Sequence, residues 1–281
     1  MAKTREVHVE TFEEYRERFK EHFRMERTED GILTVWINSQ GNPAVWSYQL
    51  HNAMCELWTA IGHDKDTELL ILTAEGDNWI AGREPESFHE VEQDPDYQKR
   101  FNNGIIDTTK IIERFLMDID IPTIGILPGP GFHWDSAIMC DITLAAPNMR
   151  FSDGHYIMGK GTVPGDGMTM LMQHFMGYKQ ANYMSYTSEG ITAEEAKNYG
   201  LITEVVERDK IYDRAMEIAK KIMAKDRIVR RLTHQVCVRP LKRRMMEEIQ
   251  YHVTAEMYST SMMAYTHEFD DEEFLKAKGL A

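Results

Sequence analysis

The sequence has little of what marks several large classes of protein. Among its 281 residues only three are cysteine, and Cys55, Cys140 and Cys237 each lie in an apolar run. Three scattered cysteines are too few for a disulfide framework or a cysteine-rich zinc site, so we interpret them as small buried apolar residues. No window approaches the roughly 20 apolar residues that span a bilayer. The charged N-terminal segment lacks the apolar stretch of a secretion signal. We therefore expect a soluble, cytoplasmic protein.

Positive charge is also scarce. The chain carries 32 Lys and Arg against 46 Asp and Glu, a net charge of −14, which argues against a nucleic-acid surface or an anionic membrane as partner. Its histidines and carboxylates lack the HxxxH spacing and the clustering of metal ligands, and no glycine-rich loop is placed to cradle a phosphate. We expect no metal and no cofactor, and a small molecule as the ligand.

What the sequence does contain is an alternation of apolar runs and amphipathic stretches. The candidate strands are 31–38, 68–73, 122–127 and 141–146, with helices between them at 47–62 and 94–117. Strands that alternate with helices predict an α/β fold with parallel character in its sheet. Before this region, residues 5–27 have the charge pattern of a solvated helix.

From residue 168 onward the pattern is almost wholly helical. Thr192 is placed to cap a helix that Gly200 ends before a short strand. Further helices are expected over 209–225 and 240–263.

Two histidines and two aspartates lie around glycine-rich turns in the middle of the chain. They are His133 and Asp135 in PGFHWDSAIMC, and His155 and Asp166 in FSDGHYIMGKGTVPGDG. A histidine followed by an aspartate on a turn can make an oriented general base, because the carboxylate fixes the imidazole tautomer and raises its basicity. A second histidine can donate a hydrogen bond to a developing oxyanion. The pattern indicates hydrolytic or enolate chemistry without a cofactor.

These residues also have structural alternatives. For His155 the alternative is an ordinary surface histidine, and for Asp166 it is the N-cap of the helix that begins near Met168. For His133, which lies between Phe132 and Trp134, it is a buried histidine with satisfied hydrogen bonds.

Six segments in order resemble the crotonase (enoyl-CoA hydratase/isomerase) superfamily over roughly residues 25–260. They are GNPAVWSYQLHNAM, LLILTAEGDNWIAG, IPTIGILPGPG, CDITLAA, FSDGHYIMGKGTVPGDG and ITAEEAKNYGLITEVV. The resemblance implies an α/β fold built as a spiral of ββα units, followed by C-terminal helices that form a homotrimer or a dimer of trimers. It divides the chain into an N-terminal helical extension (1–27), a ββα core (28–205) and a C-terminal helical oligomerisation region (206–281).

The sequence departs from the members of that superfamily that act on CoA thioesters. Where those carry a Gly-Gly pair whose backbone binds the thioester oxygen, this chain has Phe132 and His133. Where hydratases use two glutamates, it has Asp135 and His155. Because a side chain in place of glycine prevents close approach of the backbone to a ligand, we expect acyl-CoA to bind poorly.

The same departures are similar to the CoA-independent carbon–carbon bond hydrolases, the 6-oxocamphor hydrolase and β-diketone hydrolase branch. The shared features are the VPGDG turn at 163–167, His133, His155, and Trp46 with His51. The resemblance implies retro-Claisen cleavage of a β-diketone. In that reaction His155, oriented by Asp166, activates a water, His133 and Trp46 hydrogen-bond the enolate oxygen, and a keto acid is released. The spacing of eleven residues from His155 to Asp166 predicts a longer loop than that branch has.

Trp46, His51, Asp135 and Glu256 are the predicted substrate-binding residues. The alternatives are a core position for Trp46 and a helix-capping carboxylate for Asp135. Glu256 ends an apolar helix face that also carries Leu241, Met245, Ile249 and His252. Such a carboxylate points either to water or into a site, and the resemblance favours the site.

Two other functions are open from the sequence. An enoyl-CoA hydratase, isomerase or acyl-CoA thioesterase would have to tolerate the altered glycine pair. A non-catalytic scaffold with the crotonase fold would have no use for the polar set at His133, His155 and Asp166.

Overall fold

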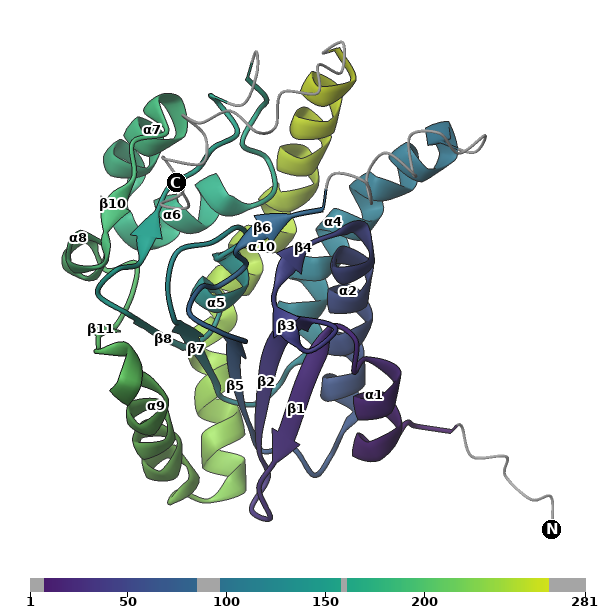
Figure 1. Cartoon of the computed structure of the whole chain (residues 1–281), viewed down its shortest axis with the longest axis vertical. Coiled ribbons are helices and arrows are strands. Elements are labelled where there is room, and N and C mark those ends of the chain that lie inside the picture. The colour runs from purple at the N-terminus through teal and green to yellow at the C-terminus, as the bar shows by residue number, and fades with distance from the viewer. Residues whose placement is uncertain (1–7, 85–96, 158–160, 263–281) are drawn as a thin grey trace.

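The computed structural model describes residues 8–84, 97–157 and 161–262 (Figure 1). The strands of the main sheet are β1 (Phe23–Arg27), β2 (Ile32–Ser39), β3 (Asn42–Pro43), β5 (Leu69–Ala74), β7 (Thr123–Leu127), β8 (Ile142–Ala145) and β11 (Glu204–Val205). Their order is β1-β2-β5-β7-β8-β11, with β3 paired to β2 off this path. From β2 to β11 the neighbouring strands on this path pair in parallel, and β1 is an antiparallel edge. The expected α/β fold with a parallel sheet is confirmed.

Helices account for most of the remaining described chain. They are α1 (Phe12–Arg18), α2 (Tyr48–His63), α4 (Tyr97–Asp118), α5 (Asp135–Ile138), α6 (Met168–Met176), α7 (Tyr178–Thr187), α8 (Ala193–Tyr199), α9 (Arg208–Met223) and α10 (Arg227–Met262). Two short strand pairs lie outside the main sheet. β4 (Val45–Trp46) pairs with β6 (Gly82–Arg83) in parallel, and β9 (Arg150–Phe151) pairs with β10 (Ile191–Thr192) antiparallel.

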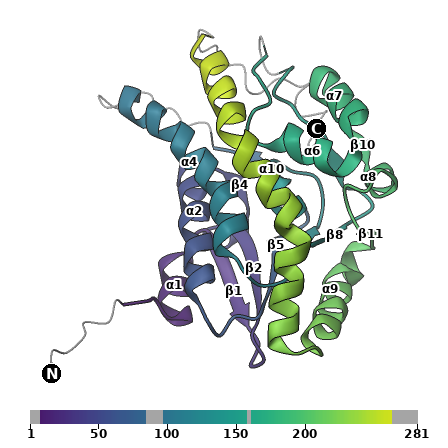
Figure 2. The same ribbon diagram turned by 180° about the vertical axis from the view of Figure 1, so that it is seen from behind.

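The core has two parts, one on each face of the sheet. Leu70 and Leu72 of β5 belong to the larger part, which also holds the buried faces of α2, α4 and α10. Leu69 and Ile71 belong to the smaller part, which α9 covers. Successive side chains of a strand point to opposite faces, so β5 is buried on both. Seen from behind, α4 and α10 run across the sheet (Figure 2).

The helix expected over 5–27 is only partly right. Helix α1 is short, and residues 23–27 form β1, which pairs with β2. In β1 the buried side chains of Phe23 and Met25 alternate with exposed charged ones, which is the period of a strand. The helix is not simply solvated either, because Tyr15 is fully buried and its hydroxyl donates to Asp64 at 2.8 Å.

The C-terminal half matches the expectation at α8 and differs at α10. Thr192 caps α8 in a capping box with Glu195, and Gly200 ends the helix with φ +86°. Helix α10, expected to start at Pro240, starts at Arg227 and contains Pro240. A proline inside a helix removes one hydrogen bond, and the long flanking segments outweigh that loss here. Cys237, expected to be buried, is exposed on this helix.

The apolar residues of α9 cover the sheet instead of an outer surface. Ile211 is buried in the smaller part of the core, and Met216, Ile218, Ile222 and Met223 pack against it. The fold of a single chain therefore accounts for these apolar residues, and they give no separate evidence for an oligomer contact on α9. Within the described ranges, no helix combines the length and the apolar character needed to cross a membrane.

Candidate active site

The predicted site residues come from loops, helices and the short strand β4 at one end of the fold. His133 and Asp135 follow β7, and His155 follows β9. Ligands of parallel α/β sheets bind beyond the carboxyl ends of the strands, so these loops are in a suitable place. The structure gathers the residues in two groups, which we call the His155 cluster (Asp153, His155, Asp166 and Glu256) and the His133 cluster (Trp46, His51, His133 and Asp135).

Asp153 holds His155 at two points. Its Oδ1 accepts a hydrogen bond from the backbone N–H of His155 at 3.0 Å and lies 2.7 Å from the ring Nδ1. The carboxylate is 1% exposed. A carboxylate on Nδ1 keeps the proton on that nitrogen, which leaves Nε2 for chemistry. The residue predicted to orient His155 was Asp166, so the orienting role passes to Asp153.

Asp166 and Glu256 lie on the other side of the imidazole. Asp166 Oδ2 and Glu256 Oε1 are each 3.7 Å from Nε2 of His155, which is ion-pair range and too long for a hydrogen bond. Asp166 Oδ2 and Glu256 Oε2 are buried and find no hydrogen-bond partner among the described residues. Buried carboxylate oxygens are costly unless they are hydrogen-bonded. The three groups are therefore suited to hold a polar ligand atom, such as that of a water, beside Nε2.

The three carboxylates change the protonation of this cluster. Burial alone would lower the pKa of His155, but the negative charges of Asp166, Asp153 and Glu256 outweigh it and raise the pKa to about 10. Burial raises the pKa of Glu256 to about 8, against the opposing effect of His155. At neutral pH the free cluster thus holds a proton on His155 and another on Glu256.

Asp166 also belongs to the turn before α6, one residue ahead of Gly167, which is the N-cap of that helix. Asp166 Oδ1 accepts a hydrogen bond from the backbone N–H of Met168, the first residue of α6, at 3.1 Å. The turn is pressed against α10 at Gly165, where a Cβ would collide with the carbonyl oxygen of His252 and lie 2.7 Å from Cβ of Glu256. The packing of this turn on α10 brings Asp166 and Glu256 to the same histidine.

His133 has the backbone conformation of a glycine. Its φ is +50°, in the left-handed region that few residues with side chains adopt. The indole N–H of Trp79 donates to its carbonyl oxygen at 3.0 Å. The imidazole stacks on Trp46 with ring centroids 3.7 Å apart and 27° between planes, and its Nδ1 is 3.7 Å from Oδ1 of Asp135. The backbone thus turns this side chain onto Trp46.

His51 completes the second cluster. It meets Trp46 edge to face at 5.6 Å, and its Nε2 lies 3.3 Å from the hydroxyl of Thr108 on α4. Burial, helped by the neighbouring His133, lowers the pKa of His51 to about 4. The ring is therefore neutral at physiological pH, and its buried Nδ1 has no hydrogen-bond partner in the described chain.

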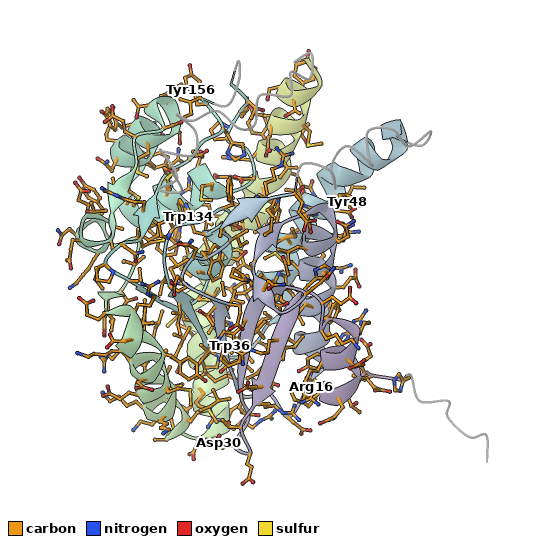
Figure 3. All side chains as sticks on the ribbon, viewed as in Figure 1. Arg16, Asp30, Trp36, Tyr48, Trp134 and Tyr156 are labelled. Atoms are coloured by element: carbon orange, nitrogen blue, oxygen red, sulfur yellow. The ribbon has the colours of Figure 1, made fainter. Side chains whose placement is uncertain are left out.

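Trp134 connects the loops of the two clusters. Its side chain, labelled in Figure 3, is fully buried and stacks edge to face on Phe151 with centroids 5.3 Å apart. Its indole N–H donates to the backbone oxygen of Ser152 at 3.3 Å. This hydrogen bond joins the loop that carries His133 to the loop that carries Asp153.

All seven predicted site residues lie in one of the two clusters. Sequence reasoning missed Asp153 and Thr108. The signal for Asp153 was present in the segment FSDGH, where an aspartate stands two residues before the histidine on a turn. Thr108 had no local signal, because its contact with His51 exists only once α2 and α4 are packed together. No group of three or more His, Cys, Asp or Glu in the described ranges is arranged to hold a metal ion.

Comparison with known proteins shows similarity to one family. The sequence model of the enoyl-CoA hydratase/isomerase family matches residues 27–274. Over 185 residues, 65% of this chain and 68% of the relative, the chain is 29% identical to a short-chain-enoyl-CoA hydratase of Clostridium acetobutylicum. Over 207 residues, 72% of this chain and 73% of the relative, it is 25% identical to a hydroxycinnamoyl-CoA hydratase-lyase of Pseudomonas fluorescens.

Solved structures give a second comparison. A β-diketone hydrolase from the cyanobacterium Anabaena sp. PCC 7120, bound to (S)-3-oxocyclohexyl acetic acid, matches with a TM-score of 0.82 and 28% identity over 88% of this chain and 97% of its own. An enoyl-CoA hydratase/isomerase from Mycobacterium paratuberculosis shares the fold, with a TM-score of 0.75 and 22% identity over 92% of this chain and 97% of its own.

Proposed function

The chain belongs to the enoyl-CoA hydratase/isomerase family, and within it we propose that the protein is a CoA-independent hydrolase that cleaves the carbon–carbon bond of a β-diketone. The observation that carries the proposal is the histidine held by Asp153, with its Nε2 facing Asp166 and Glu256. This arrangement is suited to activating water. The likeness to the β-diketone hydrolase of Anabaena also supports it.

The first step is attack of water on one carbonyl carbon of the substrate. In the neutral form of the ring, Nε2 of His155 takes a proton from the water, the new oxygen–carbon bond forms, and the carbonyl electron pair moves to oxygen. Asp153 holds the ring and balances the charge of the imidazolium. Asp166 and Glu256 hold the water near Nε2.

The second step breaks the carbon–carbon bond. The tetrahedral intermediate re-forms its carbonyl and expels the carbon between the two carbonyls, whose electron pair is delocalised onto the second carbonyl oxygen as an enolate. Donors from His133 and Trp46, which are stacked together, stabilise that oxygen. The proton that His155 took from the water then goes to the carbon. The sum is diketone plus water giving a keto acid.

An acyl-CoA reaction is the second candidate, and the names of the curated relatives favour it. A thioester oxygen would need close approach of the backbone at 132–133, where this chain carries the side chains of Phe132 and His133. The stacking of His133 on Trp46 makes the position one for a side-chain donor. We therefore place the diketone reaction first.

A substrate panel distinguishes the two reactions. The purified protein is incubated with cyclic 1,3-diketones and, separately, with crotonyl-CoA and acetoacetyl-CoA, and consumption is followed by mass spectrometry. We expect a diketone to be converted to a product heavier by one water, with ¹⁸O from labelled water in its carboxylate. Turnover of the CoA thioesters alone would replace this proposal with the hydratase or thioesterase reaction.

A further inference from the structure

Three hydroxyl groups join the loop after His155 to the end of α10. The Thr162 hydroxyl lies 2.7 Å from that of Ser259 and 3.1 Å from that of Thr260. The backbone N–H of Val163 donates to Ser259 Oγ at 3.0 Å. We call Thr162, Ser259 and Thr260 the hydroxyl clamp.

The hydrogens of this clamp can be placed consistently. Ser259 and Thr260 both donate to the backbone oxygen of Glu256, at 2.8 Å and 2.9 Å. With their own hydrogens used in this way, both hydroxyls face Thr162 as acceptors. Thr162 therefore donates, and its shorter contact is with Ser259, which also accepts from Val163. Each hydroxyl has one hydrogen to give, so this assignment satisfies every donor.

The clamp touches both halves of the His155 cluster. On one side, the backbone N–H of Thr162 donates to the backbone oxygen of His155 at 2.8 Å. On the other, the clamp ends on the carbonyl of Glu256. A continuous chain of hydrogen bonds thus runs from the backbone of His155 to the backbone of Glu256, whose side chains approach to 3.7 Å.

Such a connection answers a positioning problem. Glu256 is 101 residues from His155 in sequence and lies in the last two turns of the described part of α10, which rises away from the sheet in Figure 1. Gly165 packs on α10 at His252 and at Cβ of Glu256, but the next turn of the helix, which carries Ser259 and Thr260, lies beyond that contact. The direction of the Glu256 carboxylate depends on this turn as well. The clamp fixes this turn to the same loop that carries the histidine.

We infer that Thr162 is a positioning residue whose hydroxyl, through Ser259 and Thr260, holds Glu256 against His155. The inference rests on the proposed function for its kinetic consequences and on the geometry alone for its effect on His155. Thr162 contacts the backbone of His155 and the hydroxyls of Ser259 and Thr260, so we expect its removal to change the rate through Glu256.

Threonine to valine is the sharpest variant, because it removes the hydroxyl and keeps the shape. In Thr162→Val we expect kcat on a diketone to fall about 10- to 100-fold, in line with the effect of misplacing a catalytic group by roughly 1 Å, with KM nearly unchanged. Thr162→Ser restores the hydroxyl and should recover most of the rate. The matched control is Thr187→Val on α7, whose hydroxyl donates to the Tyr183 backbone at 2.8 Å, and it should behave as wild type.

A second readout needs no activity. Titration of the His155 ring followed by NMR should give a lower pKa in Thr162→Val than in the wild type, because the charge of Glu256 moves away, and Thr162→Ser should return to the wild-type value. An unchanged titration in a folded Thr162→Val protein would overturn the inference, as would equal loss of rate in the valine and serine variants. If no diketone is cleaved by the wild type, the proposed function fails, and the titration still decides the role of Thr162.

Discussion

Asp153 Oδ1 lies 2.7 Å from Nδ1 of His155 and, at the same time, accepts the backbone N–H of that histidine at 3.0 Å. One carboxylate oxygen therefore fixes both the main chain and the ring of a single residue. Rotation of the imidazole about its χ angles would break the contact between Nδ1 and Asp153. Nε2 therefore keeps facing Asp166 and Glu256.

Removing the orienting carboxylate should lower the rate and leave the fold intact. In Asp153→Asn, we expect kcat to fall less than in His155→Ala, for which the loss of a positioned general base is worth about 10²–10⁴-fold. The measurement is steady-state kinetics on the diketone, with melting temperature as the check on folding. His63→Ala, at an exposed histidine, is the control. A His155→Ala variant with near-normal turnover would remove His155 from the mechanism.

The rate should rise with pH. A base whose pKa is raised to about 10 keeps its proton at neutral pH, so the active neutral form of His155 grows as the pH increases towards 10. Below the pKa we expect kcat/KM to increase about tenfold per pH unit. Asp166→Asn removes the charge that raises the pKa of His155 most. The rise of kcat/KM should therefore occur at lower pH in this variant. Asp209→Asn, an exposed carboxylate on α9, should leave it in place. A rise that moves to higher pH in Asp166→Asn would contradict the assignment.

His133 offers a test that separates strain from chemistry. Both His133→Gly and His133→Ala should lose about 10²–10³ in kcat, the usual effect of removing a donor to an oxyanion. Glycine adopts a φ of +50° freely and alanine does not, so His133→Gly should be the more stable variant by about 1 kcal/mol. Denaturant melts and diketone kinetics on the two variants give both numbers. Equal stability would mean that the backbone relaxes out of the left-handed region.

Assembly into trimers or hexamers stays a prediction, and helix α10 offers an exposed apolar surface for it. Ile228, Leu232 and Val236 recur every fourth residue on α10 and are 62%, 57% and 72% exposed. A charge on this stripe should oppose burial in an interface. We expect light scattering to show an oligomer for the wild type and a smaller species for Leu232→Glu with Val236→Glu. Val9→Glu, at another exposed apolar residue, is the control. A monomeric wild type would end this prediction.

Features that depend on neighbouring residues in the sequence could be predicted from it. The cap of Thr192 and the stop at Gly200 depend on a few neighbouring residues, and α8 begins and ends where they predict. The apolar run 68–73 was expected to be a strand, and β5 (Leu69–Ala74) forms there and is buried on both faces. The sequence also predicts that Asp166 lies beside His155. In the structure its Oδ2 is 3.7 Å from Nε2, whereas the carboxylate that orients the ring, Asp153, faces Nδ1.

Features set by tertiary contact were not accessible in the same way. From the sequence, Phe23 and Met25 were expected to belong to a charged helix. They lie in a strand because β2 is there to pair with them. Asp153 stands two residues before His155 in FSDGH, but a turn aspartate that hydrogen-bonds only to backbone would give the same pattern. Which nitrogen of His155 each carboxylate faces depends on the course of a loop and on the packing of α10, and neither leaves a mark in the order of residues.

Gly165 gives the site a fixed width. The turn before α6 and helix α10 are in direct backbone contact there, with no volume left for a methyl group. Asp166 stands on one side of that contact and Glu256 on the other. The distance between the two backbones is therefore set by atomic contact, which varies less with temperature or ionic strength than an ion pair does, and the hydroxyl clamp then sets the direction of the Glu256 carboxylate. The glycine at 165 thus fixes how closely the backbones that carry the two acids approach each other.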